Sequence, residues 1–323
     1  MEVWVSILLS ICAASTPLLL AATGELVVER SGVLNLGVEG MMIIGAVTAF
    51  SVAQASGSVY GGAGAAIFAG AAFSLLFAFL TLTLVANQVA TGLALTILGL
   101  GLSGMIGESF VGLPGLKLDA VAIPGLSGLP VVGPFFNQDP LFYTSIVLVV
   151  AVAWFLFQTK AGLTLRAVGD SHDSAHALGI NVIAVRYFAI MFGGACAGLA
   201  GAYLSLVVVP QWTEGMTAGR GWIALALVVF ASWRPWRVLL GAYLFGAITI
   251  AQFHAQATDA SEFSHLPQWL FAIIAWATSL PAQFLTSLPY LATIVVLVLI
   301  AGNRRLTMIN TPASLGKSFV PDR

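Results

Sequence analysis

Long apolar runs, separated by short polar or glycine-rich stretches, dominate this chain. Several of the runs approach or reach the ~20 residues with which a helix crosses the hydrocarbon core of a bilayer. The runs are continuous, whereas the strands of a membrane β-barrel alternate apolar and polar residues over ~10 positions. We therefore predict membrane helices near residues 3–22, 33–54, 60–85, 88–108, 141–158, 187–209, 221–232, 237–254, 267–280 and 287–302.

Two of these runs, 221–232 and 267–280, are shorter than the others and are flanked by glycine or proline. Such segments are more often half-helices or re-entrant pieces than full spans. The predicted fold class is therefore an all-α polytopic membrane protein, a bundle of about 8–10 transmembrane helices with broken or re-entrant segments. Neither a soluble module nor a fixed-period repeat is visible, so residues 1–323 form a single transmembrane domain.

The composition supports this class. The chain is 59% hydrophobic and 8% charged, with a mean hydropathy of +1.00, whereas soluble domains are about 25% charged. The net charge is −1 and no basic patch is present, so we expect a lipid bilayer as a partner and no nucleic acid. Cys12 and Cys196 lie within apolar runs and are read as buried small side chains, without a disulfide or metal role.

The basic residues predict the orientation, because they concentrate on the cytoplasmic side of membrane proteins. The glycine- and proline-rich loop 109–140 is then external, as is the N-terminus, and the segment 267–280 dips in and returns or lies at the interface. The residues expected to be mostly cytoplasmic are Arg30, Lys160, Arg166, Arg186, Arg234, Arg237, Arg304, Arg305 and Lys317.

The longest internal polar stretch, Gly162–Asn181, lies in the cytoplasmic loop 159–186 between two apolar runs. Asp170 or Ser171 can cap a short helix over 171–178, and Gly179 can end it. Alanines at 175 and 177 would give that helix a slim surface suited to a groove on another protein. A membrane protein that concentrates its polar residues in one such segment is expected to touch a partner there.

Polar side chains inside apolar runs form a second candidate site, because polar groups at membrane depth are costly and usually face a cavity or a partner. Asn35 and Glu39 lie among glycines, where the helix backbone is expected to break. Another apolar helix begins at Asn87 and Gln88, close to Thr91. These five residues are candidates to line a translocation pathway, although hydrogen bonding between helices explains them equally well.

Close helix packing is the expected role of small residues that recur at helical spacing, such as Gly193, Ala197 and Gly201. Catalytic patterns are missing: no His-Glu-x-x-His occurs, and the histidines form no ligand set with the cysteines. Gly316-Lys317-Ser318 imitates the end of a phosphate-binding loop but lacks the upstream glycine. We expect no metal site, no cofactor in this chain and no nucleotide hydrolysis of its own.

The chain resembles a known family, the permeases of bacterial ABC importers of the branched-chain amino acid and ribose class. The resemblance is closest to the simple-sugar and nucleoside branch and covers nearly the whole chain. It is carried by Glu29–Met41, Asn87–Leu95, Gly162–Ile180, Gly219–Ala226, Trp233–Trp236 and Thr311–Lys317.

The resemblance implies a multi-pass subunit of the bacterial plasma (inner) membrane. It would pair with a second homologous permease, dock on an ABC ATPase with two nucleotide-binding cassettes that binds the ATP, and receive substrate from an extracytoplasmic binding lipoprotein. The polar loop would be the ATPase-coupling segment that drives alternating access. Its candidate coupling residues are Arg166, Gly169, Asp170, Ser174, Ala175, Leu178, Gly179 and Ile180.

Two departures from the family pattern are visible. The family's coupling loop usually reads Gly-Glu-Asn-Pro where this chain has Gly169-Asp-Ser-His172, which changes the local cap. The stretch 259–280 resembles an insertion before the last span, and no family role is assigned to it.

Three functions remain at the level of the sequence. The first is an importer permease for nucleosides, purine derivatives or simple sugars. The alternative is a secondary transporter driven by an ion gradient, which would usually carry ionisable relays on several helices. A membrane enzyme or scaffold is disfavoured because no catalytic constellation is present.

Overall fold

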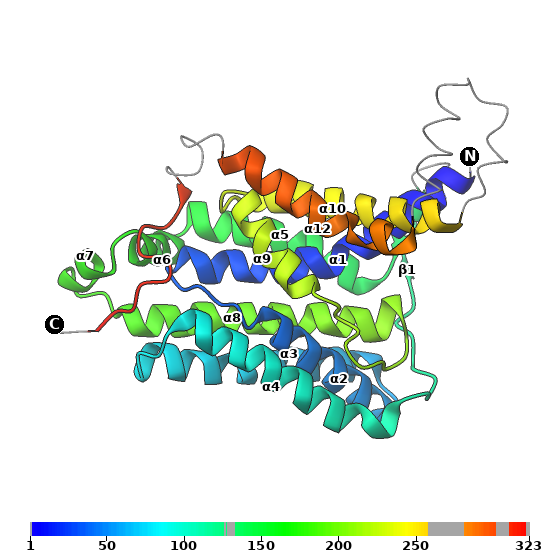
Figure 1. Ribbon diagram of the computed structural model, residues 1–323, viewed down its shortest axis with the longest axis horizontal. Helices are drawn as coiled ribbons and strands as arrows, with labels where there is room; N and C mark the ends of the chain where they lie inside the picture. The colour runs from blue at the N-terminus through cyan, green and yellow to red at the C-terminus, as the bar shows by residue number, and fades with distance from the viewer. Residues whose placement is uncertain (1, 126, 128–132, 258–280, 302–309, 321–323) are drawn as a thin grey trace.

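The computed structural model describes residues 2–125, 127, 133–257, 281–301 and 310–320. Within these residues the protein is built almost entirely from helices that run close to its long axis (Figure 1), which confirms the predicted all-α class. The long helices are α1 (Glu2–Arg30), α2 (Val38–Ser56), α3 (Val59–Ala78), α4 (Gln88–Gly107), α5 (Pro140–Gln158), α8 (Val182–Tyr203), α10 (Pro235–Ala257) and α12 (Ala282–Ala301).

Among the described residues, seven helical segments are long and apolar enough to span a membrane. They correspond to predicted apolar runs, and the shorter predicted run 221–232 is the 11-residue helix α9 (Arg220–Phe230). Its N-terminal neighbour, the stretch 209–219, is irregular, so the prediction of a half-helix is confirmed. The predicted segment 267–280 and the insertion-like stretch 259–280 lie outside the described residues.

The two ends of the bundle carry different elements. The short helices α6 (Lys160–Asp170) and α7 (His172–Ala177) lie at one end with the C-terminal residues, and the N-terminus lies at the other (Figure 1). We call these the α7 end and the N-terminal end. The predicted turn-rich loop 109–140 lies near the N-terminal end, where β1 (Val121–Ala122) pairs antiparallel with β2 (Asn137–Gln138).

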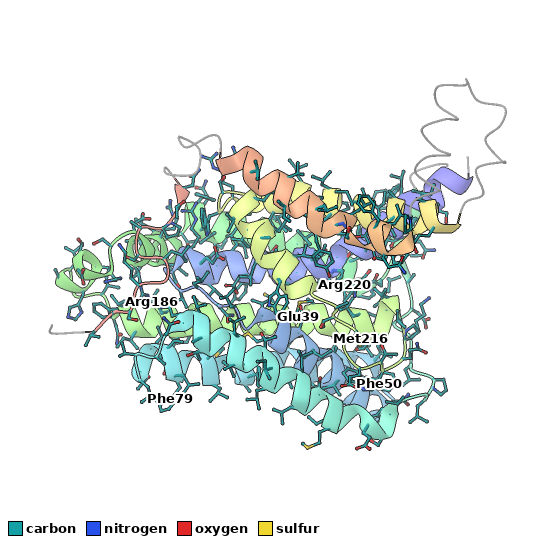
Figure 2. All side chains as sticks on the ribbon, in the orientation of Figure 1. Glu39, Phe50, Phe79, Arg186, Met216 and Arg220 are labelled. Carbon is teal, nitrogen blue, oxygen red and sulfur yellow. The ribbon has the colours of Figure 1, made fainter. Side chains whose placement is uncertain are left out.

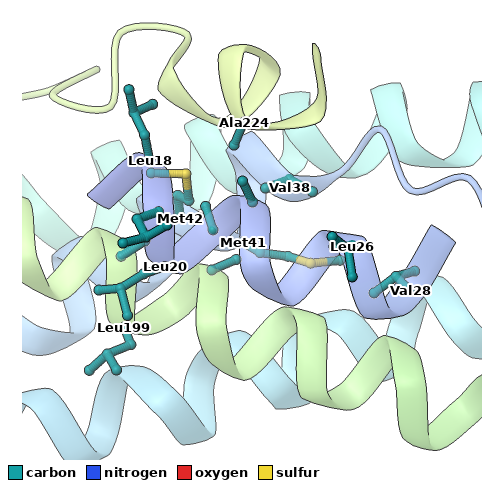
Figure 3. Packing of buried hydrophobic residues seen from close by; sticks show 14 of the residues in the cluster. Leu18, Leu20, Leu26, Val28, Val38, Met41, Met42, Leu199 and Ala224 are labelled. Carbon is teal, nitrogen blue, oxygen red and sulfur yellow. The ribbon is translucent and has the colours of Figure 1, made fainter. Parts of the chain in front are cut away.

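The core lies where α1, α2 and α8 meet, and it is filled by aliphatic and methionine side chains such as Leu20, Met41, Met42 and Leu199 (Figure 3). Glycines let the backbones approach closely here. A Cβ atom on Gly198 of α8 would collide with the backbone of α3, and one on Gly201 would collide with Met42 of α2. The predicted packing role of the small residues of α8 is therefore confirmed.

Three interruptions break the helical pattern. Residues 31–37 are non-helical between α1 and α2, as the glycines around Asn35 predicted. Single π-helical turns, η1 (Phe79–Thr83) and η4 (Leu204–Val208), end α3 and α8; such turns frequently mark functional sites. The predicted loop 159–186 is shorter than expected, because Asn181 caps α8 through a hydrogen bond to the Ala184 amide and the helix begins at Val182.

Candidate functional site

The polar stretch at the α7 end folds as a helical hairpin whose elements are capped by local side chains. The hydroxyl of Thr159 accepts a hydrogen bond from the Gly162 amide at the start of α6. The hydroxyl of Ser171 accepts one from the Ser174 amide at the start of α7. Gly179 follows α7 with φ +81°, a left-handed conformation that glycine adopts without strain. The predicted capped helix and its glycine stop are therefore confirmed.

The inner face of the hairpin is packed against the bundle. Gly169 lies against the carbonyl of Arg30, so closely that a Cβ atom would collide with it. Ala175 is buried in a small cluster with Val168, Val182 and Phe319. Ala175 thus faces inward. The prediction that it lies on the outer surface of the helix is wrong, because the apolar side of this short helix packs on the bundle.

The outer face of the hairpin carries the other candidate coupling residues. Leu178 has 81% of its surface exposed, the largest exposed fraction among the exposed large hydrophobic side chains of the described residues. Asp170, Ser174 and Gly179 are also exposed, whereas Ile180 is half-buried. Arg166 is half-buried, and its guanidinium carbon lies 5.2 Å from the centre of the Phe157 ring. Leu178 therefore forms an exposed apolar tip after α7, and Leu163 on α6, which is 59% exposed, is a second exposed leucine of the hairpin.

A buried arginine, not identified as a site residue in the sequence, joins the hairpin to the rest of the α7 end. Arg186 is fully buried (Figure 2). Its Nε donates to the Ser31 carbonyl at 3.1 Å, its Nη1 to the Lys317 carbonyl at 3.3 Å, and its Nη2 lies 3.2 Å from His172 Nδ1. Burial, and next the Arg186 charge, lower the pKa of His172, so this imidazole is neutral and its Nδ1 accepts.

The C-terminal segment 310–320, which we call the tail, runs along the hairpin. The Ser314 amide donates to the Gly169 carbonyl at 2.9 Å, and the Gly316 amide donates to the Gly32 carbonyl at 3.1 Å. The Phe319 ring centre lies 5.3 Å from each of the His172 and His176 rings. The tail therefore bridges the hairpin and the break after α1, and it holds α7 in place.

Replacing Phe319 with alanine should loosen α7 while leaving the membrane bundle intact. Phe319 is 8% exposed, and removing a buried phenylalanine side chain costs about 3–5 kcal/mol in a protein core. We expect the backbone amides of α7 to exchange with deuterium at least about tenfold faster, a factor that corresponds to ~1.4 kcal/mol. The half-buried neighbour Val320, replaced with alanine, is the control. Equal α7 exchange in both variants would contradict the role of the tail.

Glu39, near the middle of the long axis (Figure 2), holds the start of α9. Its carboxylate accepts hydrogen bonds from the Thr217 hydroxyl, from the Gly219 amide at 2.8 Å and from the Gly221 amide at 2.6 Å. Gly219 has φ +80°, and a Cβ atom on Gly221 would collide with Glu39. The irregular stretch before α9 is thus fixed at membrane depth by one carboxylate on α2.

The other candidate pathway residues cluster around the break at 31–37. The Asn35 amide oxygen accepts from the Gly37 amide at 3.0 Å, and the Gln88 oxygen accepts from the Leu34 amide at 2.9 Å. Asn87 caps α4 through the Ala90 amide, and Thr91 is half-buried one turn into that helix. The structure therefore brings Asn35 and Gln88 to the same break, and a role of these residues in translocation stays a prediction.

Glu29 and Arg30, at the end of α1, share a hydrogen-bonding partner, Trp233. The Trp233 indole donates to a Glu29 oxygen at 2.6 Å, and the Arg30 guanidinium donates twice to the Trp233 carbonyl at 3.2 and 3.0 Å. Trp233 lies in the turn between α9 and α10. The end of α1 is therefore tied to the end of α9 at the α7 end of the bundle.

The chain is similar to a known family and to several known proteins. The model of the family described as "Branched-chain amino acid transport system / permease component" matches residues 7–280. The chain is 41% identical to a putative glucose ABC transporter permease protein of Haloferax volcanii, with 95% of this chain and 94% of the relative covered. It is 37% identical to a guanosine ABC transporter permease protein of Bacillus subtilis, with coverages of 72% and 77%.

A further relative is a nucleoside ABC transporter permease protein of Lactococcus lactis, which is 31% identical over 89% of this chain and 90% of its own length. No solved structure matches the chain.

Proposed function

The chain belongs to the family of branched-chain amino acid transport system permease components, and from that premise we propose that it imports nucleosides or simple sugars, driven by a separate ATPase. It is a multi-pass protein of the plasma membrane, with apolar helices long enough to cross it. The proposed substrate classes follow the names of the relatives, which are described as glucose, guanosine and nucleoside permeases.

The observation that carries the ATP-driven mechanism is the exposed Leu178 tip on a hairpin that is anchored from within. A coupling segment must be rigid, because a force applied to it has to reach the membrane helices. The hairpin meets this need: Gly169 packs on the end of α1, and Arg186 at the start of α8 is hydrogen-bonded to Ser31. A displacement of α7 would therefore move α1 and α8 together.

The proposed partners follow from the same mechanism. An ABC ATPase with two nucleotide-binding cassettes would dock on the outer face of the hairpin and bind the ATP, and this chain would hydrolyse none. A second homologous permease would complete the membrane unit. An extracytoplasmic binding lipoprotein would deliver the substrate at the N-terminal end of the bundle.

An ion-gradient-driven transporter remains the alternative, because α1 and α2 carry buried carboxyl groups at Glu25, Glu29 and Glu39. All three accept hydrogen bonds: one oxygen of Glu25 accepts from the Asn35 amide at 3.4 Å, Glu29 accepts from Trp233, and Glu39 holds the start of α9. Such fixed partners favour a scaffold over a proton or ion relay.

Uptake by membrane vesicles that contain the chain and its native partners tests this proposal. Labelled guanosine and glucose are offered on the external side, with the binding protein, and ATP is enclosed. We expect uptake that requires the ATP and continues when an ionophore collapses the ion gradients. Uptake that needs no ATP and stops with the ionophore would overturn the proposal in favour of the ion-driven alternative.

A further inference from the structure

A polar cavity of ≈ 610 Å³ lies within this single chain, in the half of the bundle nearer the N-terminus. This volume falls in the range of small-molecule sites, about 300–1,000 Å³. The cavity is bounded by the first half of α1, the π-helical turn η4, the start of α9, the end of α10 and the start of α12. The segments 117–120 and 137–139 close it on the side of the external loop.

None of the residues that the sequence suggests for the translocation pathway lines this cavity. Glu39 is connected to it indirectly, since it holds Gly219 and Gly221 on either side of Arg220, which does line the cavity. An arginine at membrane depth is costly and usually marks a substrate path or a partner. The cavity therefore lies at the irregular start of α9, next to the Arg220 guanidinium.

Two side chains offer hydrogen-bonding groups to the cavity. Gln252 on α10 is 6% exposed and lines the cavity, and its amide has no hydrogen bond within the described part of the chain. The Gln252 polar atoms are not among the fully buried groups that lack a partner, so the amide opens onto the cavity and is available to a ligand or to water. Arg220 donates from Nη1 to the Met216 carbonyl at 2.9 Å, which leaves further N–H groups of its guanidinium to donate.

Hydroxyl groups supply the acceptors. The Tyr290 hydroxyl donates to the Ala218 carbonyl, the Thr249 hydroxyl to Phe245 and the Thr286 hydroxyl to Gln283. Each of these oxygens has used its only hydrogen, so it can only accept from a ligand. The cavity thus offers both donors and acceptors, and the hydroxyl groups of a sugar ring do both at each position. The phosphate group of a phosphorylated form adds about −1.5 to −2 charges at pH 7 and contributes acceptors only.

The charge and the aromatic lining point to the same class. Lys117 and Arg220 are matched by Asp119 and Asp139, so the lining residues within the described part of the chain carry a formal charge of zero. Such a site favours a neutral ligand over a phosphorylated one. Tyr290 and Phe253 also line the cavity with rings that are about half exposed, 47% and 53%; such rings pack on the apolar face of a sugar or a base.

A second cavity of ≈ 660 Å³ provides a contrast. It is bounded by α1, α5, α6 and α8, and its lining within the described part of the chain is apolar apart from the Thr164 hydroxyl and the Trp154 indole N–H. It offers too few polar groups for a polar solute. The polar cavity is therefore the better candidate for a substrate of the proposed kind.

We propose that the polar cavity binds a neutral polyhydroxylated ring, the sugar of a nucleoside or a free hexose, and that Gln252 and Arg220 select it. This inference rests on the proposed transport function. It adds a substrate site that is formed by this chain alone and a preference against phosphorylated forms of the same compounds.

Replacing Gln252 with leucine tests the site in the complete transporter, with Gln256→Leu as the matched control. Gln256 lies one helical turn further along α10, is exposed and lines neither cavity. We expect the maximal uptake of guanosine or glucose to fall at least about tenfold in Gln252→Leu, with normal assembly, and to stay within about twofold in Gln256→Leu. Wild-type uptake by Gln252→Leu would overturn the inference, whereas absence of ATP-driven uptake in the unmodified transporter would instead overturn the proposed function.

A labelling experiment reads out occupancy directly. A Gln252→Cys variant is treated with a membrane-impermeant thiol reagent; the natural Cys12 and Cys196 are buried and react slowly. We expect guanosine or glucose at millimolar concentration to slow the labelling at least about threefold, and guanosine monophosphate or glucose 6-phosphate to leave it unchanged. Equal protection by the phosphorylated compounds, or protection by none, would contradict the proposed ligand class.

Discussion

Leu178→Asp should lower ATP-driven uptake at least about tenfold without unfolding the protein. Burying a leucine side chain contributes about 1.5–3 kcal/mol, and a buried unpaired carboxylate is costly, so the substitution would weaken docking of the ATPase strongly. The side chain is 81% exposed in the chain alone, and substitutions at such positions change the free energy of unfolding by no more than about 0.5 kcal/mol. The measurements are uptake and thermal unfolding of each variant.

The control for this prediction is Leu178→Met, which keeps an apolar side chain of similar volume and should retain most of the uptake. Gly179→Trp is unsuitable as a second probe, because Gly179 has φ +81° and any other side chain there would strain the end of α7, although no atom lies within 4 Å. Ala175→Trp is unsuitable, since Ala175 is buried and a bulky residue there would disrupt the hairpin. Normal uptake by Leu178→Asp would show that the ATPase does not use this tip.

Glu39→Leu should abolish uptake by releasing the start of α9. The change removes the acceptor of three hydrogen bonds, from the Thr217 hydroxyl and the amides of Gly219 and Gly221. Each buried donor left unsatisfied costs about 1–3 kcal/mol, so the irregular stretch before α9 would lose its fixed position. Because the core of α1, α2 and α8 does not depend on these bonds, the permease should still assemble, as chromatography of the complex can show.

The matched control for Glu39 is Glu214→Leu, which lies on the same irregular stretch but is exposed; its uptake should remain within about twofold of the unmodified protein. Complete loss of assembly in Glu39→Leu would mean that the carboxylate serves the packing of the whole bundle. Unchanged uptake would mean that the position of α9 does not matter for transport.

Local features of the fold could be predicted from the sequence, because the physics that produces them is local. Continuous apolar runs locate the spans, and the half-helix α9 was visible as a short run flanked by glycine. The cap at Ser171 and the stop at Gly179 can be predicted because each acts within three or four residues of itself. The break around Asn35 followed from its glycines.

Contacts between distant segments could not be predicted. The His172 amide and the Ser314 hydroxyl are 142 residues apart in the sequence, and nothing near either residue indicates the contact. The same holds for Phe319 beside α7 and for Arg186, whose basic charge was read only as an orientation signal. The buried side of α7 cannot be predicted, because a six-residue helix shows too little periodicity to reveal whether Ala175 faces inward or outward. The polar cavity beside Gln252 depends on several elements that are far apart in the sequence.

The polar cavity and the hairpin are connected through α1 and α8. Tyr203 at the end of α8 lines the cavity, and Arg186 at the start of the same helix holds the hairpin. Pro17 and Leu18 of α1 line the cavity, and Arg30 ends that helix beside Gly169. Movement of α7 would therefore reach the proposed substrate site through two continuous helices.

Affinity purification of the tagged chain from its native membrane, compared with the same purification of Leu178→Asp, tests whether an ABC ATPase docks on the hairpin at Leu178. Mass spectrometry identifies the proteins recovered with each. We expect an ABC ATPase and a second permease to be recovered with the unmodified chain. We expect the Leu178→Asp variant to retain the second permease and to lose most of the ATPase. Recovery of the unmodified chain without any ATPase would contradict the account.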